Sequence, residues 1–171
     1  MSERKQNKKI DKRAPVIVGV GDLVDRSKED GLNPQELLAK ACEHAIQDSG
    51  IKELNKHIDY VGVVRFTVDF LTATNQSNFQ YSNFPRTLAN KLNVSAKNEV
   101  YAPMGGNSPQ VLLEDALVKI STGETDCALL SGGEALQTMI AKLKAGMSLD
   151  WLDEPGGCLL YTSPSPRDVS R

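Results

Sequence analysis

Aromatic residues, cysteine and histidine are all scarce in this sequence of 171 residues: 5% is aromatic, and there are three cysteines and two histidines. The cysteines, Cys42, Cys127 and Cys158, are odd in number and show no C-x-x-C spacing, which argues against a disulfide scaffold and against a zinc site. Long apolar runs are missing as well, since none approaches the ~20 residues that span a bilayer and no hydrophobic leader core follows the start. We therefore expect a cytoplasmic protein with reduced cysteines, no metal and no membrane span.

The rest of the composition is ordinary for a globular domain, with 40% hydrophobic residues, 25% charged residues and a formal charge of −2. A chain of this length folds as about one domain and buries roughly two-thirds of the surface that its unfolded form exposes. Basic side chains crowd residues 1–13, for which we predict a disordered arm. Contact with nucleic acid or an acidic membrane is the alternative, but no aromatic residue is interleaved there to stack on bases, so we expect no nucleic-acid partner.

Regular patterns begin after this arm. Residues 15–21 (PVIVGVG) are a β-branched run that predicts a strand buried on both faces. Asn33, Pro34 and Glu36 then provide the cap, the first-turn proline and the capping-box acid of a helix, and Gly50 predicts its end. The expected buried stripe of this helix consists of Leu37, Leu38, Ala41, Cys42, Ala45 and Ile46, which leaves His44 facing solvent.

The later segments continue the alternation of strand and helix. Further strands are predicted at residues 58–64, 99–102 and 127–131, and further helices at residues 85–92 and 108–122. A polar stretch at residues 72–83 is too long for a simple connector, so it either covers a site or contacts a partner chain. The resulting β-α-β-α-β-α-β order predicts an α/β fold with a mixed, mostly parallel sheet and helices on both faces.

The most informative segment joins the third strand to the helix at residues 108–122. It consists of Met104, Gly105, Gly106, Asn107 and Ser108. Glycines let a ligand approach the backbone, Ser108 is the expected helix cap, and a helix N-terminus favours negative charge, so an anion or oxyanion site is available here. The alternative is a purely structural turn. Walker, Rossmann and nucleophile-elbow motifs are all incomplete in this sequence.

A family resemblance rests on residues 15–21, on 105–110 (GGNSPQ) and on 123–135 (GETDCALLSGGEA). Over residues 14–146 the chain resembles the N-terminal half of a thiolase-superfamily protein. The resemblance implies a thiolase-like half-fold and an acetyl-CoA acetyltransferase-like activity on acyl-CoA thioesters in lipid metabolism. It implies coenzyme A thioesters as substrate or ligand and no permanently bound cofactor. It further implies a missing C-terminal half of the same fold as a partner, and allows a homodimer of the full-length protein.

The sequence departs from this family at the catalytic position. In active thiolases a cysteine stands where Gly105, or Met104 one residue earlier, stands here, and neither side chain is a nucleophile. Cys127 begins a predicted buried strand, and His44 and His57 lie outside the matching motifs. The second half, which the resemblance expects to carry a catalytic histidine and another cysteine, is absent. We therefore predict no catalytic residue, and we predict that residues 104–108 bind a thioester carbonyl or a carboxylate.

Domain organisation follows from the same reading: residues 1–13 are the arm, 14–154 an incomplete thiolase-like N-terminal domain, and 155–171 an unstructured tail. The tail is similar to translated adapter sequence, and a native Pro/Ser-rich tail is the alternative. The helix at residues 108–122 is expected to expose an apolar stripe because its partner half is missing. Three hypotheses stay open: an inactive fragment of an acyltransferase, a non-catalytic acyl-CoA or lipid-binding protein, and an unrelated nucleotide-binding domain.

Overall fold

The structure is a computed structural model that describes residues 11–67, 81, 83–149 and 151. In this part of the chain three strands form one parallel sheet in the order β2-β1-β3. The strands are β1 (Tyr60–Val64), β2 (Asn98–Ala102) and β3 (Ala128–Ser131). Val61 in the middle strand lies opposite Glu99 of β2 and Leu129 of β3. The α/β fold class predicted from the sequence is confirmed.

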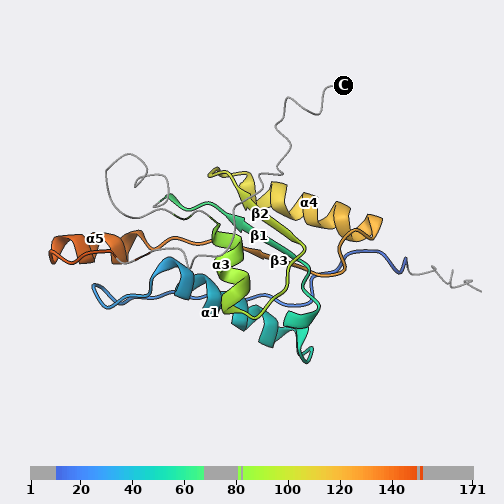
Figure 1. Cartoon of the computed structure of the whole chain (residues 1–171), viewed down its shortest axis with the longest axis horizontal. Coiled ribbons are helices and arrows are strands. Elements are labelled where there is room, and N and C mark those ends of the chain that lie inside the picture. Colours follow the sequence, from blue (N-terminus) through green and yellow to red (C-terminus); the bar gives the residue numbers. More distant parts are fainter. Residues whose placement is uncertain (1–10, 68–80, 82, 150, 152–171) are drawn as a thin grey trace, which may run out of the picture.

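Helices cover both faces of this sheet. Figure 1 shows α4 (Ser108–Thr122) on one side and α1 (Pro34–Asp48) with α3 (Phe84–Lys91) on the other. A short 3₁₀ helix, η1 (Leu54–Lys56), precedes β1, and α5 (Leu136–Lys144) follows β3. Parallel strands need crossover connections, and the helices provide them.

The first helix begins and ends where the sequence predicts. The Asn33 side chain accepts a hydrogen bond from the Glu36 backbone N–H at 2.8 Å, and Glu36 Oε2 accepts one from the Asn33 N–H at 3.3 Å, which together form a capping box. Gly50 follows the helix with φ of 65°, a conformation that favours glycine. Leu38 and Cys42 of the predicted stripe are buried.

The few aromatic residues gather in one part of the core. Phe66 and Phe84 meet edge to face with ring centroids 4.5 Å apart, and Tyr81 meets Phe84 in the same way at 4.8 Å. Tyr101 of β2 stacks on Phe84 at 6.2 Å. Edge-to-face pairs contribute beyond the area that they bury, so this cluster anchors α3 to the sheet.

A buried carboxylate joins the amino ends of the three strands. Asp59 is 8% exposed, and its side chain accepts hydrogen bonds from the backbone N–H groups of Asp126 and Cys127 at 3.2–3.3 Å. Its backbone carbonyl accepts two more, from the N–H groups of Lys97 and Asn98. Asp59 therefore connects the start of β1 to the residues that lead into both neighbouring strands.

The sequence prediction of a buried strand at residues 15–21 is wrong. This segment is not part of the sheet: β3 pairs directly with β1, and Val16 and Ile17 are 74% and 77% exposed. The segment instead lies against α1, where the Val20 N–H donates to Asp48 Oδ2 at 2.9 Å and a Cβ on Gly19 would lie 2.2 Å from the Ala45 carbonyl oxygen. An apolar β-branched pattern indicates extended backbone, but it does not determine whether that backbone pairs with a neighbouring strand.

Other predicted segments fall outside the described residues. These are most of the basic arm, most of the polar stretch at residues 72–83, and the tail. The remaining predicted elements are present, and their ends agree with the predicted ones to within two residues.

Candidate functional site

The turn at residues 104–108 joins β2 to α4 at the carboxyl edge of the sheet. Ser108 is 5% exposed, and its hydroxyl donates to the Pro103 carbonyl at 2.6 Å while its N–H donates to the Gly105 carbonyl at 3.1 Å. Ser108 is therefore the first helical residue and not the cap, which corrects the sequence prediction. Asn107 occupies the cap position without a side-chain cap bond. Ser108 does not cap the helix because its hydroxyl is already bonded to the Pro103 carbonyl, which closes the turn before α4.

The outer part of this turn is open to solvent. Met104 is 45% exposed, and Gly105, Gly106 and Asn107 are exposed as well. A Cβ on Gly106 would meet no atom within 4 Å, so a ligand can approach the backbone there. The N-terminus of α4 is thus open to solvent at these four residues. Solvent screens the helix dipole at this position, which limits its contribution to about 0.3–1 kcal/mol.

Two charged residues at the same sheet edge were missed by the sequence reasoning. Arg65 directly follows β1, and its guanidinium lies 4.7 Å from the ring centroid of Tyr101. Glu134 lies three residues after β3, and its Oε1 accepts a hydrogen bond from the Thr67 N–H at 2.7 Å. In open parallel sheets ligands bind beyond the carboxyl ends of the strands, and this rule applied to each predicted strand end would have selected both residues.

The thiols of the described residues are unsuited to nucleophilic attack. Burial raises the pKa of the Cys42 thiol on α1, and burial together with the carboxylates of Asp59 and Asp126 raises the pKa of Cys127. Both therefore stay protonated at neutral pH, whereas a reactive cysteine needs a lowered pKa. His44 is exposed, as predicted, and its Nδ1 lies 3.0 Å from the Asp22 carbonyl oxygen.

Within the described residues no cluster of three histidine, cysteine, aspartate or glutamate side chains is arranged to hold a metal ion. None of the helices in that part of the chain is both long and apolar enough to cross a membrane.

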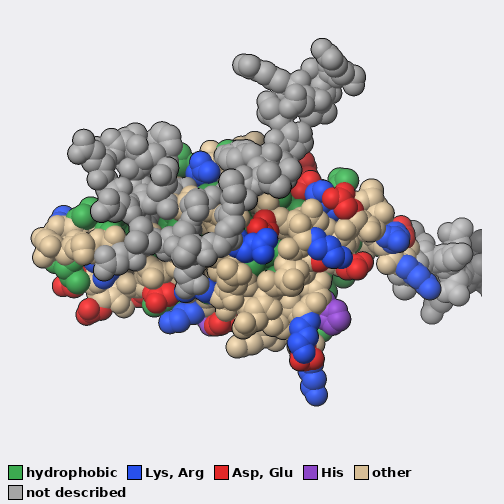
Figure 2. Space-filling model, in the orientation of Figure 1, with side chains coloured by type: hydrophobic (Ala, Val, Ile, Leu, Met, Phe, Trp, Pro, Cys, Tyr) green, Lys and Arg blue, Asp and Glu red, His purple; other side chains and the backbone are tan. Residues whose placement is uncertain are grey.

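Figure 2 shows blue Lys and Arg side chains interspersed with red Asp and Glu side chains on the visible face, so charges of both signs are mixed there.

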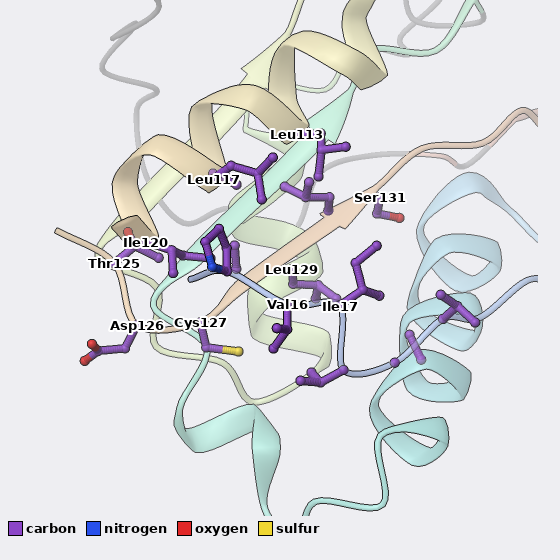
Figure 3. Close-up of a pocket in the computed structure, with 18 of the residues that line it drawn as sticks. Val16, Ile17, Leu113, Leu117, Ile120, Thr125, Asp126, Cys127, Leu129 and Ser131 are labelled. Atoms are coloured by element: carbon purple, nitrogen blue, oxygen red, sulfur yellow. The ribbon is translucent and has the colours of Figure 1, made fainter. Parts of the chain in front are cut away.

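A large cavity lies away from the turn. Its volume is about 1100 Å³, and it lies between residues 12–21, α1, α4 and the residues of and around β3. Figure 3 shows Val16 and Ile17 on one side of it, Leu113 and Leu117 of α4 on another, and Leu129 of β3. No residue of the turn at 104–108 lines this cavity. The sequence reasoning did not predict it, because it arises from the displacement of residues 15–21 from the sheet.

Comparison with solved structures gives an informative likeness. No family profile and no curated protein matches the sequence. Among solved structures, the chain is similar to a monomeric SCP2-thiolase-like protein type 1 from Mycobacterium smegmatis, with 31% sequence identity and a TM-score of 0.60. The match covers 73% of this chain and 24% of that protein, so the chain spans about a quarter of its length. The arrangement of strands and helices described above is therefore a thiolase-like fold.

Proposed function

We propose that this chain is the acyl-CoA-binding part of a thiolase-like protein, and that the turn at residues 104–108 holds the thioester carbonyl without forming a covalent bond. The observation that carries the proposal is the turn itself. It presents exposed backbone at Gly105 and Gly106, at the N-terminus of α4 and at the carboxyl edge of a parallel sheet. Such a position favours a partial negative charge on a bound oxygen.

The absence of a suitable thiol supports non-covalent binding. Position 105 is glycine, position 104 is methionine, and Cys42 and Cys127 both have raised pKa values. A thioester bound at the turn therefore meets no thiolate among the described residues. Arg65 at the neighbouring strand end offers a cation for the phosphate groups of coenzyme A.

Acyl transfer is the second candidate, and the likeness to an SCP2-thiolase-like protein favours it. In that case this chain is an inactive fragment of an acetyl-CoA acetyltransferase-like enzyme of lipid metabolism, and the missing half supplies the acid and base groups. A homodimer of the longer protein belongs to this candidate too, although the similar solved protein is described as monomeric.

A matched pair of variants tests the binding site. Asn107→Asp places a carboxylate on the turn, and Asn90→Asp makes the same exposed change at the end of α3. At about 4 Å in water two like unit charges repel by about 1 kcal/mol, and the carbonyl oxygen carries only a partial charge, so we expect Asn107→Asp to weaken acetyl-CoA binding by up to about fivefold in calorimetric titration. Asn90→Asp should leave the affinity unchanged. Equal affinities of both variants and the parent chain would exclude the turn as the site.

Mass spectrometry separates the two candidates. After incubation of the longer, full-length protein with acetyl-CoA, non-covalent binding predicts an unchanged mass, whereas this chain alone should keep its mass under either candidate. A stable acetyl adduct would exclude the binding-only function and favour acyl transfer.

A further inference from the structure

Two loops are joined by a carboxylate at the carboxyl edge of the sheet. Thr67 follows the end of β1 by three residues, and Glu134 follows the end of β3 by three residues. Glu134 Oε1 accepts a hydrogen bond from the Thr67 backbone N–H at 2.7 Å. A hydrogen bond to an ionised acceptor is stronger than one between neutral groups. Glu134 therefore holds the loop after β1 in a fixed place relative to β3.

Two glycines bring the loop after β3 close enough for this contact. A Cβ on Gly132 would lie 3.3 Å from Val64 Cβ, and Val64 is the last residue of β1. A Cβ on Gly133 would lie 2.9 Å from Leu38 Cδ1 on α1. Side chains at these two positions would push the loop away from β1 and α1. The close approach of Glu134 to the end of β1 thus depends on the residues directly before it.

The loop that Glu134 holds carries a cation. Arg65 lies two residues before Thr67, and its own N–H donates to the Ala102 carbonyl of β2 at 3.0 Å. Its guanidinium lies 4.7 Å from the ring centroid of Tyr101, which is 4% exposed and thus a fixed support. Stacking uses the flat face of a guanidinium, whereas phosphate oxygens are bound by the N–H groups at its edge. Arg65 can therefore bind a phosphate group while it stays stacked.

The short segment from Arg65 to Thr67 is held from two sides. Phe66 is 1% exposed and packs edge to face on Phe84, which fixes the segment on the side of β2 and α3. Glu134 fixes it on the side of β3. A cation whose backbone is already held in place loses less conformational entropy when it binds a ligand. Loss of the Glu134 contact should therefore weaken binding at Arg65, although the two side chains come from different loops.

We propose that Glu134 is a positioning residue, which holds Arg65 where it binds the phosphate groups of coenzyme A. The site then selects thioesters of coenzyme A over thioesters of smaller thiols that carry no phosphate. This inference rests on the proposed function, since it takes acyl-CoA as the ligand. Direct contact between Glu134 and the ligand predicts the opposite sign, because removal of an exposed carboxylate reduces its repulsion of a phosphate.

Calorimetric titration of the full chain with the two parts of acetyl-CoA tests the proposal. Adenosine 3′,5′-bisphosphate carries phosphates without a thioester, and S-acetylpantetheine carries the thioester without a phosphate. We expect Arg65→Gln to weaken bisphosphate binding about tenfold, and Glu134→Ala to weaken it about fivefold. Both variants should bind S-acetylpantetheine with the affinity of the parent chain. In the Arg65→Gln background, Glu134→Ala should have no further effect, because the two residues act through one contact.

Three further variants separate positioning from charge. Glu134→Gln keeps an acceptor oxygen for the Thr67 N–H and should retain the bisphosphate affinity of the parent chain. Glu134→Asp keeps the charge but shortens the side chain by one methylene group, so it should weaken binding about as much as Glu134→Ala; it takes the place of that variant if the alanine protein does not fold. Glu43→Ala is the control, because Glu43 is exposed on α1 and the change in net charge is the same.

Several results would overturn the inference. They are unchanged or tighter bisphosphate binding by Glu134→Ala, an equal loss of S-acetylpantetheine binding, a further loss in the Arg65→Gln background, and no bisphosphate binding by the parent chain. The proposed function fails by a different result, when Asn107→Asp leaves acetyl-CoA affinity unchanged. Because the bisphosphate has no thioester to place at residues 104–108, the two failures are distinguishable.

Discussion

Replacing Asp59 by alanine should remove a large part of the stability of this fold. The carboxylate satisfies two backbone N–H groups, those of Asp126 and Cys127, at distances of 3.2–3.3 Å. A hydrogen bond to a charged acceptor contributes about 1.5–3 kcal/mol, and the long distances favour the lower limit, so the pair contributes about 3 kcal/mol. The ion pair with Lys97 adds little, because its Nζ lies 3.7 Å from Asp59 Oδ2 and its side chain is 74% exposed.

Asp59→Ala leaves both N–H groups without an acceptor in a site that is 8% exposed. We therefore expect a loss of about 3 kcal/mol in the free energy of unfolding, and a loss of about 1–2 kcal/mol for Asp59→Asn, which keeps one acceptor oxygen. Asp30→Ala is the control, because Asp30 is exposed.

Urea unfolding followed by the fluorescence of the single tryptophan, which is 4% exposed at Trp151, measures these changes. With an m-value of about 2 kcal/mol/M, Asp59→Ala should lower the midpoint by about 1.5 M. A midpoint within 0.2 M of the parent chain at an unchanged m-value would refute the assignment of Asp59 as the residue that joins the three strands.

Three further predictions concern a buried tyrosine, the open turn and the unpaired threonine. The Tyr60 hydroxyl donates to Asp115 Oδ2 at 2.7 Å, and burial followed by this hydrogen bond raises the pKa of Tyr60. The unfolded chain therefore loses the Tyr60 proton at a lower pH than the folded chain does. The free energy of unfolding should fall as pH rises above about 10, by up to ~1.4 kcal/mol per pH unit. Tyr60→Phe should reduce that slope in urea titrations at pH 9–11. Gly105→Cys places a thiol at the N-terminus of α4, where a Cβ meets only side-chain oxygens at 3.2 and 3.3 Å. The helix dipole lowers the pKa of a thiol there, so iodoacetamide at pH 7 should alkylate it faster than the exposed control Ser95→Cys. Equal alkylation rates would contradict this effect of the dipole. Thr125→Val replaces an unpaired buried hydroxyl by a methyl group of similar size and should raise the free energy of unfolding by about 1 kcal/mol, whereas a destabilised variant would mean that the hydroxyl has a partner in solution.

Much of the local structure could be predicted because its causes lie within a few residues. The capping box of Asn33 and Glu36 and the positive φ of Gly50 depend only on neighbours along the chain. The same holds for the turn before α4, whose five residues were located from glycine, proline and serine spacing. Only its cap was wrong, because the Ser108 hydroxyl bonds to the Pro103 carbonyl five residues earlier.

Residue identity and short-range spacing were enough to predict the α/β class, the ends of the helices at residues 34–48 and 108–122, and the absence of a thiol at position 105. Packing between distant segments places residues 15–21 outside the sheet, brings Arg65 and Glu134 to its carboxyl edge, and buries the Thr125 hydroxyl without a hydrogen-bond partner. The two groups of features differ in the sequence distance between the residues that form them. Helix caps and turns are formed by residues about three to five apart, whereas the pairing of β1 with β3 joins residues such as Tyr60 and Ala128, whose contact depends on the packing of every element between them.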